Sequence, residues 1–484
     1  MTFSDHYKHW IGAFLWFAVG IFYWQTSRPG HDWGGDFSVY LWQADNFAEG
    51  RPYTQSSFVA TARSERNHPG IYPPATSLFM SPVAKTLGWD YQGWKRWLAF
   101  PLWLSLPVWF AIGRHMGLPF WPAVLATLLF ATSTIGFWIR DNVGSDTLFQ
   151  LVSGVALLVI LEGYKRGWDV RQPVGFGVSI ALLLLLCYAT RAAGLALVLA
   201  FFAGELAQHR RIRRVAVAAG VAFAIAIVVY NRWIFSANSQ YGSQFEFLPM
   251  AYVANFLYYV RSHASIWQGS PAIPRYLLSL GGLLLALWVL WKRSVLQRPG
   301  VVELYVVISY AMVTVYSTTQ NSRYLFGIYP LLVFLITFGL IDLAVHWKAL
   351  RWLPAASATL AFLTLGLAWR TVDLTPLSAG VHQQAFTDVC QFLRNSPVST
   401  LLSWNPRLFA LYTQRPSVLY AKPGELDKQL ASLPGKVAVV FYEHEMDREE
   451  LGPYLQSHES EWDKTFDNGQ FRVYLRKKEE RPRL

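Results

Sequence analysis

Residues 172–190 read QPVGFGVSIALLLLLCYAT, a run of 19 residues without a single charged side chain. A helix crosses the hydrocarbon core of a bilayer with about 20 mostly apolar residues. The stretch therefore predicts a transmembrane helix and indicates that the chain is a membrane protein.

Ten more apolar segments of similar length flank this stretch, so about eleven transmembrane helices are predicted. The next segment along the chain follows after the short turn CYATRAAG. The eleven predicted segments are 10–26, 92–113, 118–138, 144–164, 172–190, 192–209, 215–235, 273–291, 300–319, 324–346 and 354–370.

The composition changes near residue 370. Residues 371–484 hold 29 charged residues among 114, close to the roughly 25% of a soluble domain, whereas residues 1–370 hold 43 among 370. The tail also alternates strand-like stretches such as KVAVVFYE with helix-like stretches such as NPRLFALYTQ. We therefore predict a polytopic α-helical membrane body at 1–370 and a small soluble α/β domain at 371–484. This composition excludes a soluble enzyme, a disordered chain, a collagen and, with only two cysteines, a disulfide scaffold.

The loops between the segments predict the orientation in the membrane. With the N-terminus in the cytoplasm, the inner loops hold 14 Lys and Arg residues and the short outer loops hold three. Cytoplasmic loops carry the excess of basic residues, so this orientation is favoured. An odd number of spans then puts the C-terminal domain outside. The net charge of +12 is explained by topology, and the RRIRR run at 210–214 is not expected to bind nucleic acid.

The first long outer loop, residues 25–91, contains two amphipathic stretches, GDFSVYLWQADNFAEG and TSLFMSPVAKTLG. Amphipathic helices can bury one apolar face at the membrane interface. Both stretches are therefore predicted to lie on the outer membrane surface.

Two acidic residues at the outer side stand at the start of predicted helices. Asp36 opens the first amphipathic stretch, and Asp146 begins the fourth span. Each could simply stabilise a helix N-terminus. Charged residues near the bilayer are nevertheless costly, which makes both of them functional candidates.

Two arginines, Arg191 and Arg323, stand at outer membrane boundaries. They could extend to lipid headgroups, or they could hold a phosphate through charge-assisted hydrogen bonds. His68 lies just before Tyr72 and two prolines, in a turn at the membrane. No HxH, HExxH or CxxC motif occurs, so no residue is predicted to bind a metal.

The order of these pieces resembles the C-type glycosyltransferase superfamily, which is made of polytopic enzymes that use polyprenyl-phosphate sugars. It is similar in particular to lipid A aminoarabinose transferases and protein O-mannosyltransferases. Those enzymes often carry two adjacent acidic residues in the first outer loop, whereas Asp36 is followed by Phe37. The resemblance rests on GGDFSVYLWQADNFAEGRPY, NHPGIYPPATSLFMSPVAKTLG, GSDTLFQLVSGVALL, TRAAGLAL, NSRYLFGIYPLLVFL and, in the tail, SWNPRLFALYTQRPSV.

The resemblance implies a reaction at the outer face of the cytoplasmic membrane. A sugar would pass from a polyprenyl-phosphate donor to an acceptor hydroxyl on a lipid, a glycan or a protein, with inversion of configuration. Asp36 would be the general base, and Arg191 and Arg323 would stabilise the phosphate leaving group. The remaining predicted site residues are catalytic Asp146 and substrate-binding Tyr40, His68, Tyr72 and Tyr324.

No cofactor is expected, although the sequence leaves a divalent metal open. The chain contains no N-x-S/T sequon, which favours a bacterial source and hence a bacterial inner membrane. The expected partners are the lipid-linked donor, the acceptor and membrane lipids.

Two other classes of function fit a polytopic chain. A transporter or flippase of lipid-linked sugars would show internal repeats or charges in the middle of its spans. A membrane scaffold that binds a partner through its tail would not need the pattern around Asp36. Transfer of a labelled sugar from a polyprenyl phosphate in vitro would separate these classes from the enzyme.

Overall fold

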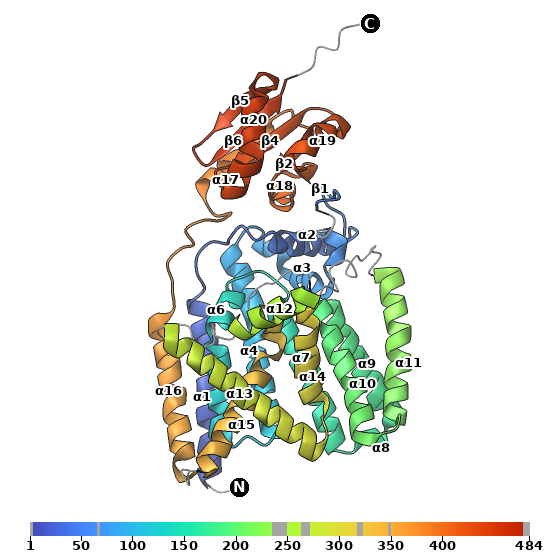
Figure 1. The fold of residues 1–484 in the computed structure, drawn as a ribbon, viewed down its shortest axis with the longest axis vertical. Coiled ribbons are helices and arrows are strands. Elements are labelled where there is room, and N and C mark those ends of the chain that lie inside the picture. The colour runs from blue at the N-terminus through green and yellow to red at the C-terminus, as the bar shows by residue number, and fades with distance from the viewer. Residues whose placement is uncertain are drawn as a thin grey trace.

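The computed structural model describes residues 3–64, 68–234, 249–262, 272–316, 323–346 and 350–477. The chain is mostly helical, with a bundle of long helices below a small α/β domain (Figure 1). The N-terminus and the C-terminal domain lie at opposite ends of the bundle. Most of the second long outer loop, from Ser236 to about Ala272, lies outside the described residues.

Each predicted membrane segment coincides with a helix or a bent helix pair. Among the described residues, five helices are long and apolar enough to cross a membrane, or six if the pair that bends by 52° at Thr132 and Ser133 is one span. The full count of eleven spans stays a prediction. The helices are α1 (Phe3–Gln25), α4 (Tyr91–His115), the bent pair α5 (Phe120–Ala131) and α6 (Thr134–Arg140), α7 (Asp146–Lys165), α9 (Pro173–Thr190), α10 (Leu195–His209), α11 (Arg214–Val229), α13 (Ala272–Gln297), α14 (Val301–Thr314), α15 (Tyr329–His346) and α16 (Leu353–Thr371).

The bend between α5 and α6 has a local cause. The hydroxyl of Ser133 accepts a hydrogen bond from the backbone N–H of Gly136 at 3.2 Å and so caps the start of α6. A side chain that satisfies the first amides of a new helix turn allows the old helix to end. The break therefore follows from the residues at the junction.

Two shorter helices of the first outer loop, α2 (Gly35–Glu49) and α3 (Ala75–Leu87), cross the end of the bundle beneath the C-terminal domain (Figure 1). α3 is amphipathic as predicted, with Met80 buried and Leu78 exposed. α2 is buried on more than one face, and its predicted position on the membrane surface stays a prediction. Both Tyr40 and Trp42 are buried, because α2 packs against α3 on one side and against α18 (Pro406–Thr413) of the C-terminal domain on another.

The C-terminal domain is built on a six-stranded sheet with the strand order β1-β3-β2-β4-β6-β5. The strands β1, β3, β2 and β4 are parallel, and β6 is antiparallel to both β4 and β5. The short strand β1 comes from the first outer loop rather than from the tail. The strands are β1 (Phe58–Val59), β2 (Thr400–Ser403), β3 (Ser417–Leu419), β4 (Val437–Tyr442), β5 (Trp462–Asp467) and β6 (Phe471–Arg476).

Helices pack against both faces of this sheet. They are α17 (Gln384–Asn395), α18, α19 (Leu426–Ser432) and α20 (Gly452–Ser457). One buried cluster joins Leu408 and Phe409 of α18 to Phe37 and Leu41 of α2, so the domain and the outer loop share a core. The other face of the sheet has its own core around Leu402.

Further contacts hold the C-terminal domain on the outer loop. The Arg63 guanidinium bonds the Glu450 carboxylate at 2.7 Å, and the Asn405 amide donates to the carbonyl of Trp33 at 2.7 Å. The amide of Ser417 in β3 donates to the carbonyl of Ser57 at 2.9 Å. The first residues of α2, including Asp36, therefore lie between the helix bundle and the soluble domain.

Candidate functional site

Asp36 is the second residue of α2, and its carboxylate binds side chains instead of capping the helix. The residue at the N-cap position is Gly34, which has no side chain to offer. The Asp36 carboxylate receives a hydrogen bond from the Tyr72 hydroxyl at 2.7 Å and pairs with Arg323 at 3.0 Å. The alternative interpretation of Asp36 as an N-cap is therefore wrong in this structure.

Asp146 lies close by, at the first position of α7. One of its carboxylate oxygens pairs with Nε of Arg323 at 2.9 Å, and the other pairs with Nη1 of Arg191. The Asp146 side chain is only 7% exposed, against 34% for Asp36. Arg323 thus bridges the two carboxylates, which come from positions 110 residues apart along the chain.

The two arginines reach the site from segment ends, as their sequence positions predicted. Arg191 ends α9 with an extended backbone, and Arg323 opens a short 3₁₀ turn that leads into α15. The Arg191 guanidinium also lies over the ring of Tyr324, 5.8 Å from its centroid. Neither guanidinium reaches bulk water freely, since the side chains are only 13% and 16% exposed. In the structure both arginines therefore bind carboxylates, where the sequence had allowed them to point to lipid headgroups.

Two tyrosines line the same cluster. The Tyr40 hydroxyl donates to Oγ of Ser145 at 3.0 Å, and the rings of Tyr40 and Tyr72 meet edge to face at 5.5 Å. Burial raises the pKa of Tyr40 to about 12 and the pKa of Tyr72 well above its ordinary value. Both phenols are therefore neutral at physiological pH, and they act as hydrogen-bond donors and acceptors.

His68 and Tyr324 differ in how the structure places them. Tyr324 touches the cluster through Arg191 and packs edge to face on Tyr316 at 5.0 Å. His68 is exposed, and its ring nitrogen accepts a hydrogen bond from the backbone of Gly70 at 3.0 Å, which caps the turn before Tyr72. In the part of the chain that the structure describes, His68 makes no contact with Asp36 or Asp146. Its predicted substrate-binding role stays a prediction, and its observed role is to shape the turn.

A third arginine in the cluster was not predicted. Arg407, in the first turn of α18, donates from Nη1 to the Tyr72 hydroxyl at 2.6 Å and pairs with Asp36 at 3.4 Å. Its side chain is 14% exposed. The stretch NPRLFALYTQ was predicted to be a helix and belongs to the family resemblance, but neither assigns a role to Arg407. Nothing in the tail sequence distinguishes this arginine from its other basic residues.

The electrostatics of the cluster follow from these contacts. Burial acts to raise the pKa of Asp36, but the charges of Arg323 and Arg407 and the hydrogen bond from Tyr72 hold it well below the ordinary value of an aspartate. Asp36 is therefore ionised at any physiological pH. In this arrangement both of its oxygens are engaged, so it is a weak proton acceptor.

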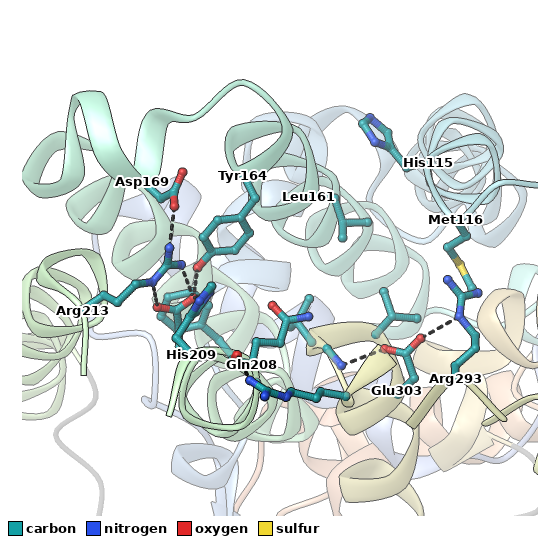
Figure 2. A pocket seen from close by; sticks show the side chains of 17 residues that line it. His115, Met116, Leu161, Tyr164, Asp169, Gln208, His209, Arg213, Arg293 and Glu303 are labelled. Atoms are coloured by element: carbon teal, nitrogen blue, oxygen red, sulfur yellow. Dashed lines mark hydrogen bonds and ion pairs between the residues drawn. The ribbon is translucent and has the colours of Figure 1, made fainter. Parts of the chain in front are cut away.

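A separate polar cavity of about 420 Å³ lies at the opposite end of the bundle, near the ends of α4 and α10 (Figure 2). Two of the arginines that line it form ion pairs with acidic residues. Arg213 pairs with both Asp169 and Glu205, at 2.5 and 2.7 Å, and Arg293 pairs with Glu303 at 3.1 Å. These pairs join helix ends to one another. None of the predicted site residues lines this cavity.

Within the described ranges, no group of three or more His, Cys, Asp or Glu side chains is arranged to hold a metal ion. The charges that converge at Asp36 and Asp146 are instead guanidinium groups. Such a cluster is suited to an anionic ligand with several oxygen acceptors, such as a phosphate.

The chain matches no known family model and no curated protein sequence. Its structure is similar to that of ArnT from Cupriavidus metallidurans bound to undecaprenyl phosphate, with a TM-score of 0.61 and 12% identity over 97% of this chain and 98% of that one. It is also similar to the oligosaccharyltransferase AglB from Archaeoglobus fulgidus in complex with an inhibitory peptide and a dolichol-phosphate. There the TM-score is 0.60 and the identity 12%, over 100% of this chain and 75% of that one.

The TM-scores establish a shared fold, and at identities this low the similarity establishes nothing more than the fold. ArnT and the archaeal oligosaccharyltransferase are both C-type glycosyltransferases, so the fold predicted from the sequence motifs is confirmed. The chain shares that fold, and several of its described helices are long and apolar enough to cross a membrane.

Proposed function

We propose that this protein is a membrane glycosyltransferase that moves a sugar from a polyprenyl-phosphate donor to an acceptor hydroxyl. The observation that carries the proposal is the convergence of Arg191, Arg323 and Arg407 on Asp36 and Asp146 at one end of the bundle. Two structures with the same fold were solved with undecaprenyl phosphate and with a dolichol-phosphate, which supports a lipid phosphate as the ligand.

The arginines fit the demands of the leaving group. When the bond between the sugar C1 and the phosphate oxygen breaks, its electron pair stays on that oxygen and the phosphate gains negative charge. Preorganised cations at that position stabilise the developing charge. Asp146, with one oxygen on Arg191 and the other on Arg323, would hold two of these cations in place. We therefore assign Asp146 a positioning role.

Asp36 would accept the proton of the attacking hydroxyl once the donor is bound. In the free site its low pKa makes it a poor base. A donor phosphate competes for Arg323 and Arg407, and each guanidinium that moves to the phosphate removes a positive charge from Asp36. The pKa of Asp36 then rises toward its ordinary value, and the base becomes competent only when there is a sugar to transfer.

The finer points of the proposal come from the sequence. We propose an inverting reaction at the outer face of a bacterial inner membrane, with the N-terminus in the cytoplasm and the C-terminal domain in the periplasm. The acceptor would be a cell-envelope glycan, such as a lipopolysaccharide component, or a protein. No cofactor is proposed, and transfer measured with and without EDTA decides whether a divalent metal takes part.

A direct assay tests the proposal. Purified full-length protein in nanodiscs would be given a polyprenyl-phosphate donor with a labelled sugar, together with membrane extract as the source of acceptor. Transfer of the labelled sugar to a product that resists mild acid, unlike the sugar phosphate of the donor, supports glycosyltransferase activity. Movement of labelled donor across a vesicle membrane without transfer would identify a flippase instead.

A further inference from the structure

Arg407 enters the cluster from the C-terminal domain, whereas the other charged residues of the cluster belong to the helical body and its outer loop. It lies at the start of α18, which packs on α2, and its guanidinium fits against the backbone of Gly35. A Cβ atom at Gly35 would come within 2.4 Å of Nη2 of Arg407, so a larger residue there would force the guanidinium to shift. The small size of Gly35 therefore lets the guanidinium of Arg407, more than 370 positions later in the chain, lie close to the backbone beside Asp36.

Arg407 also has hydrogen-bond donors that no described residue engages. Both of its hydrogen bonds to described residues, to Tyr72 and to Asp36, come from Nη1. A guanidinium offers five N–H donors in a planar fork that suits phosphate oxygens. Within the described part of the chain, Nε and Nη2 of Arg407 make no hydrogen bond. A residue serving only as an anchor between domains would be expected to use this fork more fully.

The domain does not depend on Arg407 for its attachment. Strand β1 of the outer loop pairs with β3, and Arg63 bonds Glu450 at 2.7 Å. The Asn405 amide bonds Trp33, and the amide of Val381 donates to the carbonyl of His31 at 3.1 Å. The partly buried charge of Arg407 therefore calls for another explanation.

The charge balance of the site explains why a partly buried arginine is placed there. Three guanidinium groups face two carboxylates, which leaves one excess positive charge. A sugar phosphodiester carries one negative charge and would bring the site to neutrality. When the acceptor proton moves to Asp36, that carboxylate becomes neutral while the departing phosphate gains its second negative charge. The site stays neutral through the whole reaction only if Arg407 is present.

We propose that Arg407 is a third phosphate ligand, supplied by the C-terminal domain, and that it moves from Asp36 to the donor phosphate when the donor binds. The inference rests on the proposed function and adds a role for the soluble domain. The active site is then complete only when this domain is docked, and the domain delivers a charge that the membrane body lacks.

The test measures lipid-phosphate binding separately from catalysis. Full-length protein in nanodiscs would be titrated with undecaprenyl phosphate, with the uncharged polyprenol as the ligand control. Arg407→Gln is expected to weaken undecaprenyl phosphate binding about tenfold to 100-fold, the usual effect of a lost charge-assisted hydrogen bond. Arg407→Lys is expected to recover part of this loss, since it keeps the charge without the fork.

The matched control is Arg448→Gln, which removes the same charge from the surface of the same domain. The Arg448 side chain is 64% exposed and pairs with Glu443, so wild-type affinity is expected. Domain docking would be followed in every variant by limited proteolysis of the linker at 373–380. Intact docking with weakened binding supports the inference.

The outcomes separate the two proposals. If Arg407→Gln binds undecaprenyl phosphate as tightly as wild type, Arg407 is not a phosphate ligand. If its linker becomes sensitive to protease in step with the loss of affinity, Arg407 is an anchor and the inference is overturned. If wild type itself binds the polyprenol and undecaprenyl phosphate equally, the proposed function fails first.

Discussion

Replacing Asp36 by Asn is the most informative single change, because it should affect donor binding and transfer in opposite directions. Asn keeps the size of the side chain and an oxygen that accepts from Tyr72, but it removes the charge and the proton acceptor. The helix start should survive, since Gly34 and not Asp36 occupies the N-cap position. The Asp36 side chain is 34% exposed, so we expect a loss of only about 1 kcal/mol in the free energy of unfolding.

The expected effect on transfer is large. A positioned general base contributes roughly 10²- to 10⁴-fold, so the single-turnover transfer rate of Asp36→Asn should fall at least about 100-fold. The measurement uses enzyme in excess over a labelled donor, with melting temperature recorded on the same sample. A transfer rate equal to that of wild type would refute the role of Asp36 as the base.

The expected effect on binding is a gain. In the wild type, a donor phosphate must draw Arg323 and Arg407 away from Asp36, which costs the energy of two partly exposed ion pairs. If each pair is worth about 0.5 kcal/mol, Asp36→Asn should bind undecaprenyl phosphate about fivefold more tightly. Unchanged or weaker binding would refute the competition between Asp36 and the donor. A merely structural role for Asp36 does not produce tighter binding together with slower transfer.

Three further outcomes are expected. Arg323→Gln should slow transfer from the lipid donor roughly 100-fold and more than Arg191→Gln does, because Arg323 bonds Asp36 and Asp146 whereas Arg191 bonds only Asp146 of the two. Donor kinetics of both variants check this, and values equal to wild type would leave the arginines a structural role. With donor bound, the single-turnover rate should fall as the pH drops below about 4, the ordinary pKa of an aspartate, because the bound phosphate removes the cations that depress the pKa of Asp36. An acid limb that persists in Asp36→Asn would assign it to another group. A reporter that is active only in the cytoplasm should stay silent when it is fused after residue 484, given the 14 to three ratio of basic residues in the inner and outer loops. A strong signal would reverse the orientation.

The low pKa of Asp36 also links the site to stability. Because the pKa is lower in the folded protein than in the unfolded chain, the stabilisation by Asp36 is fully present above the ordinary pKa near 4. It is lost as the pH falls further, through the depressed value. At neutral pH the cluster therefore stabilises the contact between the outer loop and the C-terminal domain, with Arg407 on one side and Asp36 on the other.

Local properties of the sequence were enough to predict the class of the protein. Runs such as 172–190 are apolar whatever surrounds them, and a bilayer accepts them only as helices, so the helices of the body coincide with the predicted segments. The strands and helices from β2 to β4 follow from short patterns in the tail. The strand β5 does not follow from a local pattern, because WDKTFD carries three charges, its side chains are mostly exposed, and its extended conformation depends on pairing with β6.

The sequence also placed Asp36, Asp146, Arg191 and Arg323 among the candidates, because Asp36 opens an amphipathic stretch and the other three stand at the ends of apolar segments, where a charge is conspicuous. Only the tertiary structure decided which of these groups meet. Ion pairs form at 3 Å between residues whose separation in the chain exceeds 100 positions, and no local pattern encodes that distance. The same holds for β1, for the burial of α2 on both sides, and for Arg407, whose importance depends entirely on the docking of one domain against the start of one helix.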